Sequence, residues 1–301
     1  MAAPEIDDLS GIETTGHEWD GLKELNNPLP KWWLWTFYGC IVWGIIYVIL
    51  FPAWPMVNGA TQGLLGYDSR LEVAETIADA QAEQAVYIER IAELEIEDVA
   101  ADPELMQFAV AGGAAIFRTY CSQCHGAGAA GAMAAGYPNL NDDAWLWGGQ
   151  MHEIYQTVAH GIRWEADDDT RLSAMPAYGA DDLLTNEEID AVVEFVWALS
   201  HTGEDEEVDW EMANLGAEIF EANCAACHGD QAIGNHDLGA PNLIDAIWLY
   251  GGDRATLRET VYYARAGVMP PWIDRLGDAG IKQVALYVHS LGGGEATSDE
   301  E

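Results

Sequence analysis

The chain has 301 residues, enough for more than one domain, and carries 51 acidic against 12 basic residues, for a formal net charge of −39. So negative a surface excludes nucleic acid as a partner, because phosphate binding needs cationic side chains. The charge is typical of a solvated, salt-tolerant surface, and it also suits docking of a basic soluble protein.

Residues 1–30 are acidic and show no sustained hydrophobic periodicity, so we expect a loosely ordered segment. A cleavable signal peptide is not expected, because a basic start and an early apolar core are both missing. Residues 32–51 are 20 residues without a charge. As an α-helix they would span roughly 30 Å, the thickness of a bilayer's hydrocarbon core. Tryptophans flank the run, as in interfacial aromatic belts, and we predict one transmembrane helix within residues 31–57 rather than a buried helix of a soluble domain.

The segment 58–101 is predicted to be a helical linker. Residues 58–70 are rich in glycine and resemble turns. From about Leu71 to Val99 the chain is rich in Ala, Glu and Gln, with apolar residues at helical spacing, which indicates an amphipathic helix. Asp102 and Pro103 then provide an N-cap and a first helical residue for the next helix.

A five-residue motif occurs twice, as residues 121–125 (CSQCH) and 224–228 (CAACH). The pattern C-x-x-C-H is the attachment signature of c-type haem, in which two thiols bind one porphyrin and the histidine ligates the iron. Zinc would need further ligands at finger-like spacing, and none appears. The sequence therefore predicts two covalently bound haem c groups, attached through Cys121, Cys124, Cys224 and Cys227, with His125 and His228 as iron ligands.

The segments around the two motifs are copies of each other at an offset of 103 residues. We predict two tandem domains, at 102–203 and 204–294, followed by an acidic tail at 295–301. After Thr157 the first copy carries about nine extra residues, around the sequence IRWEADDDT. A capping box at Thr185 opens an amphipathic helix, whose counterpart begins at Ile281. Helices at both ends with long loops between them indicate class I cytochrome c domains, so the expected fold is all-α.

The second iron ligand decides between electron transfer and ligand chemistry. Met175 and Met269 occupy equivalent positions, and each precedes a proline. Thioether ligation raises the haem potential, which suits an electron carrier. Histidine is the rival ligand, at His152 or His160 in the first copy and at His236 in the second.

Further contacts with the haem are less specific. Trp145, Trp248, Arg163 and Arg265 are candidates for N–H donors to the haem propionates, although the tryptophans suit plain packing equally well. Residues 138–140 and their copy at 241–243 are expected to shape the loop over each iron-ligating histidine, where a backbone carbonyl accepts the imidazole N–H.

The stretch TTGHEWDGLKELNNPLPKWWLWTFY, residues 14–38, resembles the N-terminal hallmark of one family. This family is the membrane-anchored dihaem subunit (CcoP/FixP, subunit III) of cbb3-type cytochrome c oxidases. The resemblance implies His–Met ligation at both irons, assigned by domain as His125 with Met175 and His228 with Met269. It also implies electron relay to a monohaem cytochrome c subunit and to the haem–copper catalytic subunit, which reduces O₂.

The expected role is serial electron transfer from a periplasmic cytochrome c, either soluble or membrane-anchored. No independent catalytic constellation is present, so turnover would belong to the oxidase complex.

Lys23 and Lys31 precede the span whereas the next basic residue is Arg70, which favours a cytoplasmic N-terminus. Bacterial C-x-x-C-H proteins mature outside the cytoplasmic membrane, so we expect a single-pass inner-membrane protein with periplasmic haem domains. The alternatives are a membrane-tethered carrier for another terminal reductase or dehydrogenase, a haem-based gas sensor, and an accessory subunit that only holds the complex together.

Overall fold

The computed structural model describes residues 5–201 and 207–296. The chain divides into two compact units, Met1–Ala82 and Glu83–Glu301, with the boundary inside helix α2 (Ser69–Glu93). The described residues are mostly helical. From residue 297 on, the expected acidic tail lies outside the described residues, but Glu295 is not part of a free tail: its N–H donates to the Gly149 carbonyl at 2.9 Å.

The N-terminal segment contains a β-hairpin. Strands β1 (Thr14–Trp19) and β2 (Leu22–Leu25) pair antiparallel. Asp20 and Gly21 form the turn between them with positive φ angles of 49° and 83°, which an Asp-Gly pair favours in a two-residue hairpin turn. The described part of residues 1–30 is thus more ordered than expected, because the alternation is too short to give a periodic signal. The fold is mostly helical, as expected, with two short hairpins added.

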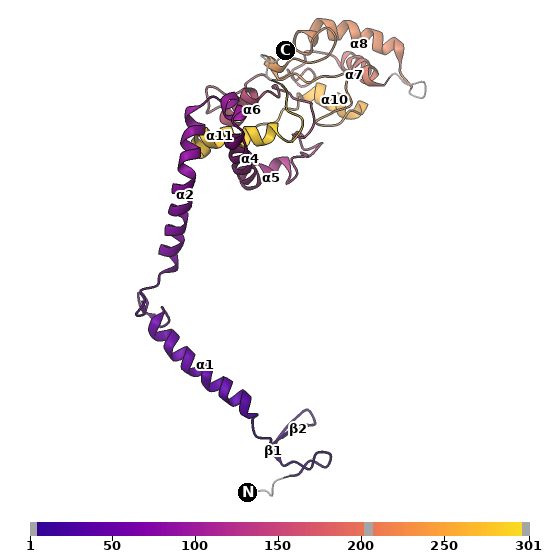
Figure 1. Ribbon diagram of the computed structural model, residues 1–301. Coiled ribbons are helices and arrows are strands. Elements are labelled where there is room, and N and C mark those ends of the chain that lie inside the picture. Colours follow the sequence, from indigo (N-terminus) through magenta and orange to yellow (C-terminus); the bar gives the residue numbers. More distant parts are fainter. Residues whose placement is uncertain (1–4, 202–206, 297–301) are drawn as a thin grey trace. The chain divides into compact units, whose positions relative to one another are not determined.

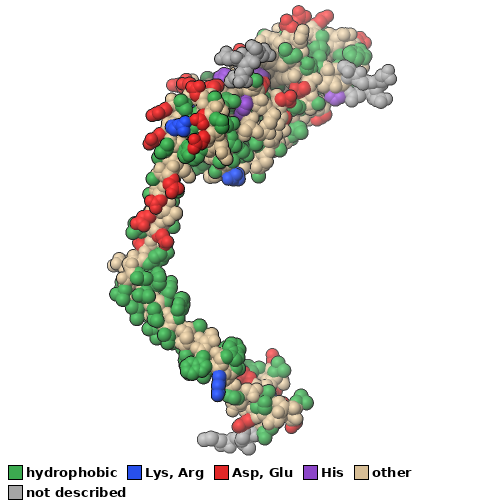
Figure 2. All heavy atoms as spheres, in the orientation of Figure 1, with side chains coloured by type: hydrophobic (Ala, Val, Ile, Leu, Met, Phe, Trp, Pro, Cys, Tyr) green, Lys and Arg blue, Asp and Glu red, His purple; other side chains and the backbone are tan. Residues whose placement is uncertain are grey.

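Helix α1 (Lys31–Leu50) confirms the predicted apolar helix. Of the described helices, it alone is long and apolar enough to cross a membrane, with a mean hydropathy of 1.8, and none of that stretch is buried within the chain. Hydrophobic side chains coat it (Figure 2), so it is not the core helix of a soluble domain. After the short hairpin of β3 (Pro55–Met56) and β4 (Gly59–Ala60), the N–H groups of Leu64 and Leu65 return to the last carbonyls of α1 at 2.9 and 3.0 Å.

The second unit holds the two copies of the repeat. Asp102 accepts hydrogen bonds from the N–H groups of Glu104 and Leu105, and the predicted capping box at Thr185 is present, which confirms both helix starts. Helix α3 (Ile96–Ala101) precedes the first copy. The helices of the first copy are α4 (Pro103–Ile116), the π-helical turn η1 (Phe117–Cys121), α5 (Ser122–His125), α6 (Met151–His160) and α7 (Asn186–Ser200). Those of the second are α8 (Trp210–Asn223), α9 (Ala225–His228), η2 (His236–Leu238), α10 (Arg254–Tyr263) and α11 (Ile273–His289).

The two copies exchange their last helices. Helix α11, from the end of the second copy, packs against α4 and α6 of the first, whereas α7 packs against α8 and α10 of the second. Figure 1 shows the yellow α11 among the purple α4 and α6, with α7 beside α8. We call α4, η1, α5, α6 and α11 lobe 1, and α7, α8, α9 and α10 lobe 2. The lobes therefore do not coincide with the segments 102–203 and 204–294, because each segment contributes its last helix to the other lobe.

Each lobe has one close helix crossing at a glycine. A Cβ on Gly113 of α4 would lie 2.1 Å from the carbonyl oxygen of Gln283 in α11, and a Cβ on Gly216 of α8 would lie 2.0 Å from the carbonyl oxygen of Ala191 in α7. Gly113 and Gly216 are equivalent in the repeat, and so are Gln283 and Ala191. The lobes therefore share one helix-crossing geometry, assembled from different pieces of the chain.

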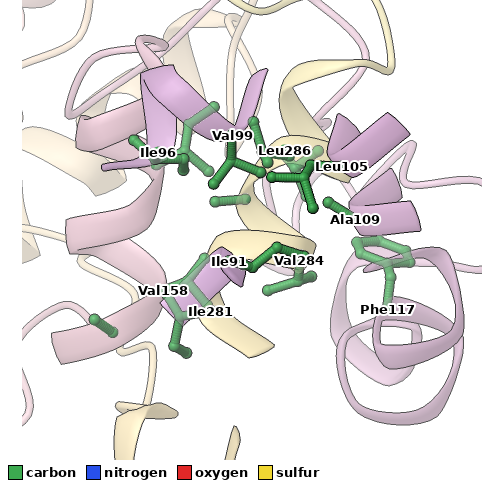
Figure 3. Close-up of a cluster of buried hydrophobic side chains, with 14 of the residues drawn as sticks. Ile91, Ile96, Val99, Leu105, Ala109, Phe117, Val158, Ile281, Val284 and Leu286 are labelled. Atoms are coloured by element: carbon green, nitrogen blue, oxygen red, sulfur yellow. The ribbon is translucent and has the colours of Figure 1, made fainter. Parts of the chain in front are cut away.

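The exchange follows from chain connectivity. Only residues 201–209 separate α7 from α8, and sequential elements joined by a short connection usually pack side by side. Once α7 covers lobe 2, only α11 remains to cover lobe 1. Its buried side chains Ile281, Val284 and Leu286 close the lobe 1 core with residues from α2, α3, α4 and α6 (Figure 3).

Candidate functional site

Lobe 2 contains a cavity beside its C-x-x-C-H motif. Cys224, Cys227 and His228 line it, together with Met175 from the first copy of the repeat. Its remaining wall is largely apolar, and includes Val192, Val193, Val196, Phe220, Leu243, Leu257 and Val261. We call this the lobe 2 cavity. Because α7 lies in lobe 2, the methionine loop that precedes α7 lies there as well.

Lobe 1 contains the converse arrangement. Cys121 and Met269 both pack against the lobe 1 core, with Leu140 and Trp145. The Met269 loop is fixed by a pair of backbone hydrogen bonds with Ile162, of 2.9 and 3.0 Å. The structure thus brings Met175 to His228 and Met269 to the motif of His125. The methionine of each copy therefore lies in the lobe of the other copy's motif, and not in the lobe of its own, because the helix exchange carries each methionine loop with it.

Both motif histidines are oriented by a backbone carbonyl, as expected for residues 138–140 and their copy. The Nδ1 atom of His125 lies 3.3 Å from the Pro138 oxygen, and Nδ1 of His228 lies 3.1 Å from the Pro241 oxygen. Burial lowers the pKa of both imidazoles, while the carbonyl bond opposes the shift. The lowered pKa favours the neutral ring, and a ring that donates from Nδ1 to the carbonyl leaves Nε2 as the nitrogen that can ligate a metal.

The two thiols of each motif lie in different surroundings. Burial raises the pKa of Cys121 and of Cys224 to about 11, with a further contribution from the second cysteine of each pair. Cys124 and Cys227 are exposed. The first sulfur of each motif is thus a neutral thiol facing the interior, unlike the low-pKa thiolates of redox dithiols.

The rival histidines have other partners or face solvent. His160 lies 3.2 Å from the Asp167 carboxylate, and exposed His152 lies 3.7 Å from Glu97. His236 is exposed. Among the described residues that line the lobe 2 cavity, His228 is the only histidine.

The four candidates for propionate contacts divide into two groups. The Trp145 indole N–H donates to the Gly293 carbonyl at 2.6 Å, so this donor is already used. Trp248, Arg163 and Arg265 line the lobe 2 cavity. Arg265 donates to the Thr256 carbonyl at 2.8 Å and to the Thr260 hydroxyl, and the contacts of Arg163 are described below.

Sequence reasoning missed Arg171, which is the structural equivalent of Arg265. Arg171 donates to Thr157 and to the Glu153 carbonyl, at 3.0 and 3.2 Å, and these acceptors are the repeat equivalents of Thr260 and Thr256. Counting back four residues from each methionine would have found this pair. Arg163 instead lies in the extra segment 162–170, which agrees with the nine residues expected there.

Trp147 was also missed. It is 6% exposed, and its indole N–H has no partner among the described atoms. A buried donor without an acceptor is costly and indicates an absent polar group. The Trp147 ring packs against Gly239, which lines the lobe 2 cavity. The apolar wall of this cavity, with its Cys, His and Met side chains, fits a porphyrin.

Two protein families match the chain. The N-terminal domain of cytochrome oxidase-cbb3, FixP, matches residues 11–58. Cytochrome C oxidase, cbb3-type, subunit III, matches residues 108–196 and 211–288.

Individual relatives are similar over nearly the whole chain. The cbb3-type cytochrome c oxidase subunit CcoP of Cereibacter sphaeroides is 55% identical over 282 residues, covering 94% of this chain and 95% of that protein. The FixP subunit of Sinorhizobium medicae is 50% identical over 291 residues, covering 96% and 98%. CcoP of Azospirillum brasilense is 49% identical over 302 residues, covering 98% and 100%. The chain therefore belongs to the CcoP/FixP family, subunit III of the cbb3-type cytochrome c oxidases.

Proposed function

We propose that this chain carries two haem c groups and passes electrons from a periplasmic cytochrome c to the catalytic subunit of a cbb3-type oxidase. The haems would be attached at Cys121 and Cys124 in lobe 1, and at Cys224 and Cys227 in lobe 2. The family membership supports the role, and the repeated motif supports the number of haems. When bound, each haem supplies an iron that changes its charge by one electron.

The iron ligands are proposed to cross between the copies. His125 would share its iron with Met269, and His228 would share its iron with Met175. The observation that carries this assignment is the lobe 2 cavity, in which Met175 and His228 line the same space. The protein's part would be to exclude water, to orient each imidazole through a proline carbonyl and to supply a methionine thioether as the second iron ligand. Sulfur ligation suits an electron carrier.

The membrane arrangement is part of the same proposal. Helix α1 would cross the inner membrane once, with the N-terminal hairpin in the cytoplasm and both lobes in the periplasm. Lys23 and Lys31 on the N-terminal side support this orientation. The monohaem cytochrome c subunit and the haem–copper subunit are the expected partners within the complex.

Single-haem variants test the crossed ligation. Replacing Cys224 and Cys227 with serine leaves one haem, attached in lobe 1. In that background we expect Met269→Ala to abolish the long-wavelength absorption band of ferric iron bound by thioether sulfur, whereas Met175→Ala leaves it. Replacing Cys121 and Cys124 should reverse the result. Loss of the band with the methionine of the same copy would contradict the crossed assignment.

A further inference from the structure

The two copies of the repeat meet through a reciprocal contact. A Cβ on Gly239 would lie 2.3 Å from the ring of Trp147, and a Cβ on Gly136 would lie 2.7 Å from the ring of Tyr250. Trp147 and Tyr250 are equivalent in the repeat, and so are Gly136 and Gly239. The copies therefore face each other around a local two-fold axis, as in an isologous contact.

One segment breaks this symmetry. Gly161 and Ala264 end equivalent helices with positive φ angles of 71° and 53°, and the arginines Arg171 and Arg265 hold equivalent contacts. Residues 162–170 between Gly161 and Arg171 have no counterpart in the second copy. We call these nine residues the extra segment.

Arg163, in the extra segment, contacts both methionine loops. Its Nε donates to the Ser173 carbonyl and its Nη1 donates to the Gly267 carbonyl, both at 2.9 Å. Ser173 lies two residues before Met175, and Gly267 lies two residues before Met269. One guanidinium thus bonds equivalent carbonyls in two loops that are proposed to ligate different irons.

Both the backbone and the guanidinium of Arg163 are held in a defined position. Its φ angle is 54°, a left-handed conformation that non-glycine residues adopt only when the surroundings hold them there. The guanidinium lies 5.9 Å from the Trp147 ring, and burial lowers its pKa. The planar fork of arginine donates from two fixed directions at once, which a lysine ammonium on a flexible stem does not reproduce.

From these contacts we infer that Arg163 is a positioning residue that ties the two methionine loops together and so couples the two haem sites. The inference rests on the proposed crossed ligation. It assigns a role to the extra segment: Ile162 holds Met269 through the backbone, and Arg163 connects that loop to the loop of Met175. Loosening this connection should weaken the thioether bond at both irons, although Arg163 belongs to only one copy.

Carbon monoxide binding to the reduced, full-length holoprotein tests the inference, because CO binds only after the methionine has moved away. In backgrounds where Met175→His or Met269→His blocks one iron with nitrogen, CO reports on the other. We expect Arg163→Gln to speed CO binding about fivefold or more at each iron, and to lower both reduction potentials. Arg163→Lys keeps the charge but reaches one carbonyl at a time, so its CO binding should also be faster than in the parent.

Arg70→Gln is the matched control, because it removes the same charge from the first unit of the chain and should change neither iron. An effect of Arg163→Gln at one iron only, parental CO binding in Arg163→Lys, or an equal effect of Arg70→Gln would each overturn the inference. If Arg163→Gln fails to retain both haems, the lysine variant decides. If the parent protein lacks the thioether band, the proposed ligation fails instead, so the two failures are distinguishable.

Discussion

Lobe 1 and lobe 2 share a helix-crossing geometry but differ at two equivalent positions of their last helix. Lys282 in α11 is equivalent to Asp190 in α7, and Leu286 is equivalent to Glu194. Lys282 is buried, and its ammonium donates to the carbonyls of Ile91, Ala92 and Leu94 at 3.2, 3.2 and 2.7 Å. It also pairs with Asp278 at 2.7 Å.

In lobe 2 the same face of the helix binds arginines. Asp190 pairs with Arg258 at 2.7 Å near the surface. Glu194 is buried and receives two bonds from Arg254, of 2.6 and 2.8 Å, and one from the Asp209 N–H at 2.9 Å. The same helix position therefore has a different use in each lobe. In lobe 1 it provides a donor for the last carbonyls of the linker helix α2, whereas in lobe 2 it binds groups of lobe 2 itself. Figure 2 shows separate clusters of acidic side chains on the visible face of the second unit, with few basic ones among them.

The largest expected effect comes from Lys282. Lys282→Met keeps the length of the side chain but leaves three helix-end carbonyls and Asp278 without their donor, so we expect the free energy of unfolding of lobe 1 to fall by about 2–4 kcal/mol. Hydrogen exchange of residues 87–99 should rise with it. Asp190→Ala, the equivalent change in lobe 2, removes a half-exposed pair and should cost about 1 kcal/mol or less. If Lys282→Met and Asp190→Ala lower the free energy of unfolding equally, the contacts of Lys282 do not stabilise the end of the linker helix α2.

A smaller effect is expected where the copies meet. Gly239→Ala places a Cβ against Trp147 at a residue with a φ angle of 60°, so we expect a loss of about 1–3 kcal/mol in chemical denaturation. Gly136→Ala meets the less buried Tyr250 ring at a longer distance and should cost less. If Gly136→Ala costs as much or more, the contact does not depend on the burial of the aromatic ring.

The smallest effect is a difference in acid stability between the lobes. The hydrogen bonds from Arg254 hold the pKa of Glu194 below its usual value. A carboxylate with a lowered pKa in the folded state stabilises above its unfolded pKa of about 4.3, and this contribution is lost as the pH falls through the folded value. Lobe 1 has Leu286 at the equivalent position, so its last helix makes no such contribution there.

Glu194→Gln should therefore cost lobe 2 about 1–2 kcal/mol at neutral pH and nothing at low pH, after allowing for the partial exposure of Arg254. Hydrogen exchange of α7 and α8, measured across this pH range, checks the expectation. A cost that is the same at every pH would mean that packing, and not charge, is lost.

The amino-acid sequence alone was enough to identify the candidate haem-binding residues, the repeat and the apolar helix. The C-x-x-C-H motifs, the Met-Pro pairs and the offset of 103 residues identify equivalent positions, because each needs particular residue types at a fixed spacing. The 20 uncharged residues determine α1 in the same way. Sequence reasoning missed the hairpin at Asp20 and Gly21, because a two-residue turn gives no periodic pattern. It also missed the indole N–H of Trp147, because an unpaired donor cannot be recognised before the fold is known.

The folded chain was needed to see that Met175 lies beside His228 and that Met269 packs against the core of lobe 1. A repeat alignment shows that Met175 and Met269 are equivalent, but both pairings with His125 and His228 satisfy it equally. The connection at 201–209 keeps α7 beside α8, and each methionine loop follows its helix into the opposite lobe. Arg163 became visible for the same reason: its two acceptor carbonyls, at Ser173 and Gly267, are 94 residues apart in the sequence and meet only once the helices have been exchanged.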